Sequence, residues 1–255
     1  MNTSHSRRDF ILKTGAATLM MATLPAWAAD GRKITVAFVG VAHIHTPNYL
    51  KIVSRRPDVR IKYVWDHDPA RAARRAREVN AQVPAELNTI WSDPEISAVI
   101  ILAETDRHYD LVMAAARAGK NLFVEKPMGI TAKRSDKMAE AINKAGLIFT
   151  TGYFSRTDPK NIFLKSEVAA GHFGKISRVR ASNCHNGSLG GWFDGEWRWM
   201  ADPKIAGVGA FGDLGTHKLD ILMWMFGDIT SVTGYIHPVT GRYGRSGIID
   251  PNTGR

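Results

Sequence analysis

The feature that most constrains the fold is an alternation of short apolar runs with helix-like stretches, which begins at Lys33. The apolar runs predict buried strands at residues 34–39, 60–65, 98–102, 121–124 and 147–151, and a short strand at 89–91. The stretches between them predict helices at residues 46–54, 69–80, 109–118 and 131–144. Strands that alternate with helices form a parallel sheet with crossover helices on its faces. Residues 33–151 are therefore predicted to form a doubly wound α/β domain of the Rossmann type.

The pattern changes after residue 151. Helices are expected at residues 159–170 and 213–226, strands at 175–182 and 229–236, and an irregular tryptophan-rich segment at 190–200. This order does not alternate, so residues 152–255 are predicted to form a second, α+β domain. The polar, glycine-rich stretch 241–255 follows only two or three expected strands, so we expect this domain to be truncated and its sheet incomplete.

The first residues are expected to form an export signal. Residues 6–13, Ser-Arg-Arg-Asp-Phe-Ile-Leu-Lys, resemble a twin-arginine export signal, and a small-x-small cleavage site follows at residues 26–28. An amphipathic helix or a membrane span is the alternative, but the apolar run 14–24 is too short for a span and Pro25 interrupts it. We expect residues 1–28 to be a signal peptide and the folded protein to be periplasmic, with no membrane attachment after its removal. Cys184 is the single cysteine, which fits a protein that folds before export without a disulfide.

The formal net charge of +10 does not indicate nucleic-acid binding. Its lysines and arginines are scattered, and the densest stretch, residues 71–77, is interpreted as a solvated helix face. No zinc-finger spacing or basic–aromatic interleaving accompanies them. The expected partner is a small molecule.

Chemistry is expected first at Glu125-Lys126-Pro127, directly after the apolar run 122–124. Open α/β sheets bind their ligands at the carboxyl ends of the strands. Proline prevents the strand from continuing and fixes the turn that presents the lysine.

A dinucleotide fingerprint is expected after the first strand, where the sequence reads Gly-Val-Ala-His-Ile-His from Gly40 to His45. Only the first glycine of G-x-G-x-x-G is kept: Ala42 replaces the second and His45 the third. Asp66, at the end of the second strand, can accept hydrogen bonds from ribose hydroxyls and repel a 2′-phosphate. Candidate cofactor-binding residues are thus Gly40, Ala42, His43, Ile44 and Asp66, with NAD slightly favoured over NADP.

His43 and His45 also allow another interpretation. An H-x-H pair after a first strand can bind a metal in barrel hydrolases, with further ligands at later strand ends. His67 and His108 follow, but the chain is short for a barrel and lacks its eightfold repetition. We therefore expect no metal.

The second cluster is the glycine-rich stretch 207–220, in which Asp213 and His217 lie four residues apart. That spacing places both on one helix face, although Asp213 could equally be a helix cap. Together with the upstream Glu-Lys-Pro, this cluster resembles the glucose–fructose oxidoreductase/inositol dehydrogenase (Gfo/Idh/MocA) family.

The resemblance implies a Rossmann domain joined to a carboxyl-terminal domain with an open, mostly antiparallel sheet through which the chains form homo-oligomers. It implies NAD or NADP as cofactor, with contacts from Thr105, His108, Glu125 and Lys126. It also implies Lys126, Asp213 and His217 as catalytic residues, and a cis bond before Pro127.

These residue types suit hydride transfer from an alcohol. His217 would accept the hydroxyl proton, Lys126 would stabilise the developing negative charge, and Asp213 would orient substrate or histidine. A less favoured variant has Lys126 as the base. Trp192, Trp197 and Trp199 are expected mainly as core or lid residues, although a sugar ring could stack on one of them.

Three functions stay open from sequence. The first is an NAD(P)-dependent oxidoreductase acting on a sugar, cyclitol or derivative. The second is an NAD-dependent glycoside hydrolase of the same fold, and the third is a non-catalytic ligand-binding relative.

Overall fold

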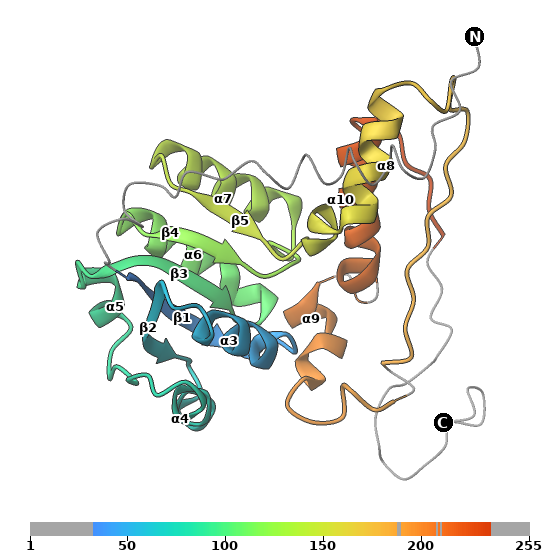
Figure 1. The fold of residues 1–255 in the computed structure, drawn as a ribbon. Helices are drawn as coiled ribbons and strands as arrows, with labels where there is room; N and C mark the ends of the chain where they lie inside the picture. The colour runs from blue at the N-terminus through green and yellow to red at the C-terminus, as the bar shows by residue number, and fades with distance from the viewer. Residues whose placement is uncertain (1–32, 188–189, 208, 210, 236–255) are drawn as a thin grey trace, which may run out of the picture.

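The fold is built on a five-stranded parallel sheet in the order β2-β1-β3-β4-β5 (Figure 1). The computed structural model describes residues 33–187, 190–207, 209 and 211–235. The strands are β1 (Ile34–Val41), β2 (Val59–Trp65), β3 (Ile96–Leu102), β4 (Asn121–Val124) and β5 (Phe149–Thr151). All four pairings are parallel. The chain passes from β1 to β2 on one side and then returns to β3 on the other, so the topological switch point lies between β1 and β3.

Both faces of the sheet are covered, and its central strands β1 and β3 are accordingly largely apolar. On one face, Ala37 and Val39 of β1 pack with α6 (His108–Arg117) and α7 (Ala132–Lys144). On the other, Phe38 packs with α3 (Thr46–Ser54) and α4 (Pro69–Glu78). Side chains alternate along a strand, so β1 contributes to two cores at once. The fold class expected for residues 33–151 is confirmed.

One predicted element in this part is wrong. Residues 89–91, expected as a strand, lie in the short helix α5 (Asn88–Ser92). Leu87, Ile90 and Trp91 all pack on the core, and Ile90 is fully buried. Their spacing of three and four residues is that of a helix face, and a short apolar run cannot distinguish this from a strand.

The second half of the described chain is mainly helical. Its helices are α8 (Pro159–Ala169), α9 (Pro203–Ala206) and α10 (Thr216–Phe226), with short 3₁₀ turns η2 (Phe154–Thr157) and η3 (Arg198–Ala201). Figure 1 shows α8 and α10 packed side by side beyond the end of β5. The strands expected at residues 175–182 and 229–236 do not form in the described residues, which end here at 235. A strand needs a neighbour for its backbone hydrogen bonds, and no described strand lies beside either segment.

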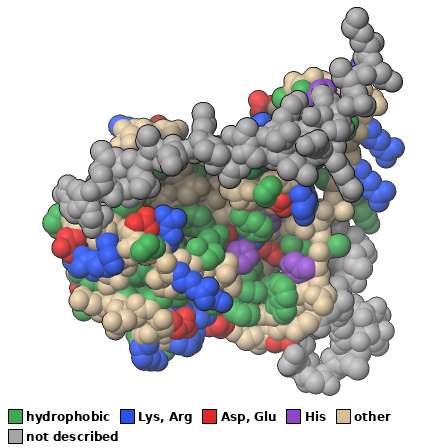
Figure 2. Space-filling model, viewed as in Figure 1, with side chains coloured by type: hydrophobic (Ala, Val, Ile, Leu, Met, Phe, Trp, Pro, Cys, Tyr) green, Lys and Arg blue, Asp and Glu red, His purple; other side chains and the backbone are tan. Residues whose placement is uncertain are grey.

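Ion pairs hold the second half together and join it to the first. Arg156 of η2 binds Asp220 of α10 within the second half, with Nη2 and Oδ1 2.5 Å apart, and Arg75 of α4 lies 3.2 Å from Glu196 in the tryptophan-rich segment. Arg71 and Arg75 are nearly buried, at 9% and 7% exposed. The interpretation of residues 71–77 as a solvated helix face is therefore wrong for these two arginines, which neutralise carboxylates. On the face in Figure 2, lysines and arginines are interspersed with acidic side chains.

No helix among the described residues is long and apolar enough to cross a membrane. The expected export signal, residues 1–28, and the tail 241–255 lie outside the described residues.

Candidate active site

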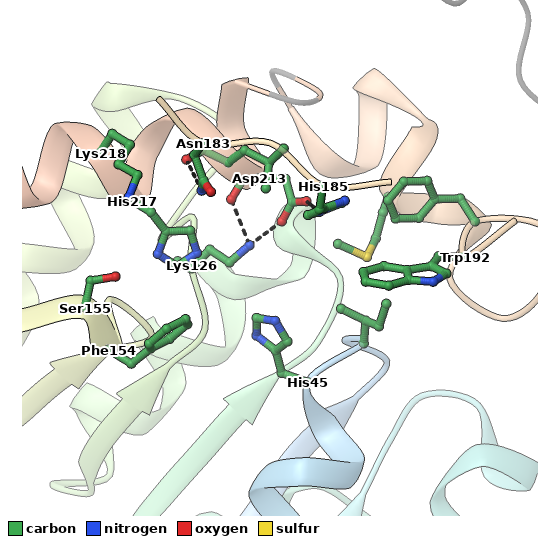
Figure 3. A pocket seen from close by; sticks show the side chains of 14 residues that line it. His45, Lys126, Phe154, Ser155, Asn183, His185, Trp192, Asp213, His217 and Lys218 are labelled. Carbon is green, nitrogen blue, oxygen red and sulfur yellow. Dashed lines mark hydrogen bonds and ion pairs between the residues drawn. The ribbon is translucent and has the colours of Figure 1, made fainter. Parts of the chain in front are cut away.

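Lys126 stands at the carboxyl end of β4, where the sequence predicts it, and the bond to Pro127 is cis. Its side chain is only 2% exposed. The ammonium Nζ contacts the Asp213 carboxylate and lies 3.1 Å from the Asp213 backbone oxygen (Figure 3). A buried lysine is costly unless it is paired, so these two acceptors hold the ammonium in place.

Asp213 and His217 reach the same cavity from successive elements. The predicted helix 213–226 begins at Thr216, and Asp213 instead lies in a preceding π-helical turn, Phe211–Gly215. The Thr216 hydroxyl donates to the Gly212 carbonyl oxygen at 2.7 Å within this turn. π-Helical turns of this kind are frequent at functional sites.

The pKa values of Asp213 and His217 are both lowered, but for different reasons. Burial opposes ionisation of Asp213, but the neighbouring Lys126 ammonium holds the pKa of this carboxyl below its usual value. Burial, and then Lys126, lower the pKa of His217. His217 Nδ1 is buried and has no hydrogen-bond partner among the described residues. A neutral imidazole with a free nitrogen can accept a proton or a hydrogen bond.

The cavity that these residues share has a volume of about 290 Å³. Figure 3 shows Lys126 and His217 pointing into it, with His45 below and Trp192 to one side. Its other lining residues include Ile44, Phe154, Asn183, His185 and Met200. Trp192 is 42% exposed and packs against His185 with ring centroids 5.0 Å apart. Of the three tryptophans considered from sequence, Trp192 is the one that lines this cavity.

Sequence reasoning missed the contact of His45 with Glu125; it considered His45 as a misfit in the glycine pattern and as one half of a possible metal-binding H-x-H pair. His45 Nδ1 lies 3.2 Å from Glu125 Oε2, and the Lys126 backbone N–H donates to Glu125 Oε1 at 2.8 Å. Burial works against ionisation of Glu125, but these partners and His43 lower its pKa to about 2. Gly152 is needed beside it, because a Cβ there would lie 2.3 Å from Glu125 Oε1. No sequence spacing signals this contact, because His45 and Glu125 are 80 residues apart.

The turn expected to hold the cofactor is tightly built. Gly40 has φ +76°, and a Cβ on it would lie 2.4 Å from Ala103 Cβ, so only glycine lets β1 approach the end of β3 this closely. The His43 N–H donates to the Leu102 carbonyl at 2.9 Å. Ala42 is buried, and its carbonyl oxygen lies 3.4 Å from Trp199 Nε1. Burial lowers the pKa of His43 to about 3.

Asp66 lies at the end of β2 as expected, but its carboxylate is fully buried and already bound. It accepts from the Val41 N–H at 2.7 Å, from the Asp68 N–H at 2.8 Å and from Arg71 Nη2 at 2.7 Å. Arg71 also lies 2.8 Å from Glu104 Oε1. A ribose hydroxyl can bind the Asp66 carboxylate only if it replaces the hydrogen bond from Arg71. The ribose contact of Asp66 stays a prediction.

Thr105 and His108 follow β3, and both are buried. The His108 ring nitrogens face the Ala103 and Met128 carbonyl oxygens at 3.1 and 3.2 Å. Burial lowers the pKa of His108, so its neutral ring donates to one of the two carbonyls at a time. His108 thus ties the end of β3 to the turn after Lys126. Cofactor contacts by Thr105 and His108 stay predictions.

Comparison with known proteins identifies the family. Residues 34–153 match the oxidoreductase family with an NAD-binding Rossmann fold, and residues 163–250 match the GFO/IDH/MocA C-terminal domain. The scyllo-inositol 2-dehydrogenase (NAD(+)) of Bacillus subtilis is 29% identical over 80% of this chain and 57% of its own length. The scyllo-inositol 2-dehydrogenase (NADP(+)) IolW of the same organism is 28% identical over 62% of this chain and 42% of its own.

The same fold appears in the crystal structure of a putative myo-inositol dehydrogenase from Sinorhizobium meliloti. It aligns with a TM-score of 0.60 at 25% identity, over 77% of this chain and 56% of the neighbour. The chain thus spans about half the length of the relatives it matches. Both halves of the expected two-domain fold class are represented in the matches. The chain belongs to the GFO/IDH/MocA family of oxidoreductases.

Proposed function

We propose that the chain is an NAD(P)-dependent oxidoreductase that transfers hydride between a hydroxyl-bearing carbon of a sugar or cyclitol and a nicotinamide cofactor. The observation that carries this proposal is the meeting of Lys126, Asp213 and His217 in one cavity at the carboxyl end of the parallel sheet. The relatives named as inositol dehydrogenases support the substrate class.

Each residue has a role that its surroundings support. His217, with a lowered pKa, is neutral near pH 7, so its ring can accept the hydroxyl proton as the alcohol is oxidised. Lys126, held by Asp213, would donate to the same oxygen and stabilise its developing charge. The nicotinamide, when bound, supplies the hydride acceptor. The proton thus passes to His217, and the electron pair leaves with the hydride.

The cofactor is proposed to lie across the switch point between β1 and β3. Gly40 shapes the turn there, because it lets the end of β1 lie close to Ala103. The position of Asp66 at the end of β2 supports NAD over NADP, while Arg71, which pairs with it, is a cation that a 2′-phosphate could bind. Comparing the dissociation constants of NAD⁺ and NADP⁺ by calorimetry tests this preference.

The direct test follows reduced nicotinamide by absorbance while the purified protein is offered inositols and free sugars with NAD⁺ or NADP⁺. Loss of one hydrogen-bond donor to a developing oxyanion costs about 10²- to 10³-fold in kcat, so Lys126→Ala should lose that much. Lys160→Ala, an exposed lysine of α8, is the matched control and should keep full activity. No turnover of any polyol, or full activity in Lys126→Ala, contradicts the proposal. Glycoside cleavage without net cofactor reduction would identify the hydrolase alternative.

Two further properties are part of the proposal. Export of the folded protein to the periplasm by the twin-arginine route is supported by Arg7-Arg8 and the cleavage site that follows. Changing both arginines to lysine should keep the protein in the cytoplasmic fraction.

Self-association through the carboxyl-terminal half is supported by the exposed apolar side chains of Ile162, Phe173 and Met223. Light scattering coupled to gel filtration should show a mass of at least two chains.

A further inference from the structure

We propose that His43, His45 and Glu125 form a binding site for a divalent transition-metal ion beside the Lys126–Asp213 pair. Within the part of the chain that the structure describes, they are the only group of three or more histidine, cysteine or acidic side chains placed to share an ion. One ligand atom from each lies within 4.8 Å of the other two. The site shares His43 and Glu125 with the expected cofactor contacts, but its test measures metal binding alone, so its failure is distinguishable from failure of the hydride-transfer proposal.

The separations suit a four-coordinate ion. Glu125 Oε2 lies 3.2 Å from His45 Nδ1 and 3.8 Å from His43 Nδ1. Metal–ligand bonds of about 2.0–2.1 Å in a tetrahedral site place neighbouring donor atoms about 3.3 Å apart. Glu125 Oε2 and His45 Nδ1 are already at this spacing, and His43 Nδ1 must move closer to Glu125 to complete the site. His43 Nδ1 would exchange its 3.2 Å contact with the His45 N–H for the metal.

The donor set points to the class of ion. Two imidazole nitrogens and one carboxylate suit Zn²⁺, Co²⁺ or Ni²⁺, whereas Ca²⁺ and Mg²⁺ prefer sites built from oxygen. A set of two histidines and one glutamate, with a fourth position left open, is that of catalytic rather than structural zinc sites.

The protein holds these ligands firmly. His43 and His45 lie in the turn between β1 and α3, and Glu125 directly follows β4. The Lys126 N–H binds the second Glu125 oxygen, and such outer contacts fix the orientation of metal ligands. Glu125 is fully buried and His43 2% exposed, while His45 is 34% exposed and offers a path of entry.

The site adjoins the reaction cavity. His45 lines the 290 Å³ cavity, and His43 lines a neighbouring cavity of about 20 Å³, which is large enough for one water. Lys126 and Asp213 line both cavities. The positive charge of Lys126 is paired with Asp213, which reduces its repulsion of a cation at the trio. An ion here would have room for a water ligand next to the substrate.

The test uses the untagged protein, treated with chelator, dialysed and titrated with Co²⁺. We expect one Co²⁺ per chain with the strong visible bands of four-coordinate cobalt, and their loss when Zn²⁺ displaces it. His45→Ala and Glu125→Gln should each weaken binding at least about 100-fold, because outer-shell changes alone cost 10- to 100-fold. His172→Ala is the control, since His172 is an exposed histidine that pairs with Glu167 alone among the described carboxylates.

Absence of cobalt binding, or binding unchanged in His45→Ala, overturns the site. Circular dichroism establishes whether each variant is folded. Should Glu125→Gln fail to fold, His45→Ala, at a partly exposed position, and a His43→Ala variant decide the question, because both leave the buried carboxylate in place.

Discussion

Replacing Gly40 with alanine tests the link between the cofactor turn and the sheet. The new Cβ would lie 2.4 Å from Ala103 Cβ and 2.7 Å from Ala103 Cα, and Gly40 has φ +76°. A left-handed backbone costs an alanine about 1–2 kcal/mol, partly offset by about 0.4–1 kcal/mol from the less flexible unfolded chain. Forcing an extra methyl into a packed site adds about 1–3 kcal/mol. The free energy of unfolding should fall by about 1–5 kcal/mol.

The chain supplies matched controls. Gly119 has φ +67°, and nothing lies within 4 Å of a Cβ built on it, so Gly119→Ala carries the backbone cost without the collision. Gly195 is open and has no positive φ, so Gly195→Ala should change stability by no more than about 0.5 kcal/mol. The difference between Gly40→Ala and Gly119→Ala therefore isolates the contact between β1 and β3.

Urea unfolding followed by circular dichroism measures all three variants, and calorimetry with NAD⁺ measures their cofactor binding. Gly40→Ala should also weaken NAD⁺ binding more than Gly119→Ala does, because it separates β1 from β3 at the switch point. Equal losses of stability in Gly40→Ala and Gly119→Ala would refute the reasoning.

Three further predictions follow from the buried charges. Gly152→Ala should lower the free energy of unfolding by about 1–3 kcal/mol, because its Cβ meets the fixed Glu125 carboxylate at 2.3 Å; thermal unfolding measures this. Arg71→Ala should cost about 3 kcal/mol or more in urea unfolding, because it leaves the buried Asp66 carboxylate without its cation. The His217 ring, whose pKa is lowered by burial and Lys126, should titrate by NMR below the usual value of about 6.5. Alcohol oxidation, which needs the neutral ring, should therefore fall only at pH below that value.

Each of these predictions has a control variant. Arg56→Ala removes an exposed arginine that pairs with Asp58, so it should change stability far less than Arg71→Ala does, and equal losses in the two variants would contradict the buried ion pair. Gly234→Ala, where a Cβ meets nothing within 4 Å, is the control for Gly152→Ala. Lys126→Met should raise the pKa of His217, and no change would show that the ammonium does not act on this ring.

Much of the fold followed from local sequence pattern. Buried parallel strands are apolar on both faces, so the runs that became β1 to β5 were visible, with ends shifted by one or two residues. The segment around Ile90 was predicted as a strand and forms a helix, because three apolar residues fit a strand or one helical turn equally well. The segments 175–182 and 229–235 have strand-like composition, but composition does not supply a neighbouring strand.

Some contacts of the candidate site could be predicted from the sequence and others could not. The convergence of Lys126 with Asp213 and His217 was predictable, because strand ends meet at one edge and a spacing of four residues keeps a common face. The contact of His45 with Glu125 was not, because it joins two elements that sequence spacing does not relate. The burial of Arg71 was not predicted for a similar reason: this residue of α4 pairs with Asp66 and Glu104, which follow the ends of β2 and β3.

The most direct measurement of the central claim is the kcat of His217→Asn for oxidation of an identified polyol substrate. His172→Asn, the same substitution at an exposed histidine, is assayed beside it. If His217 accepts the hydroxyl proton, kcat of His217→Asn should fall by about 10²- to 10⁴-fold, while His172→Asn stays at the level of the unchanged protein. A His217→Asn variant that turns over as fast as His172→Asn would contradict the assignment of this cavity as the hydride-transfer site.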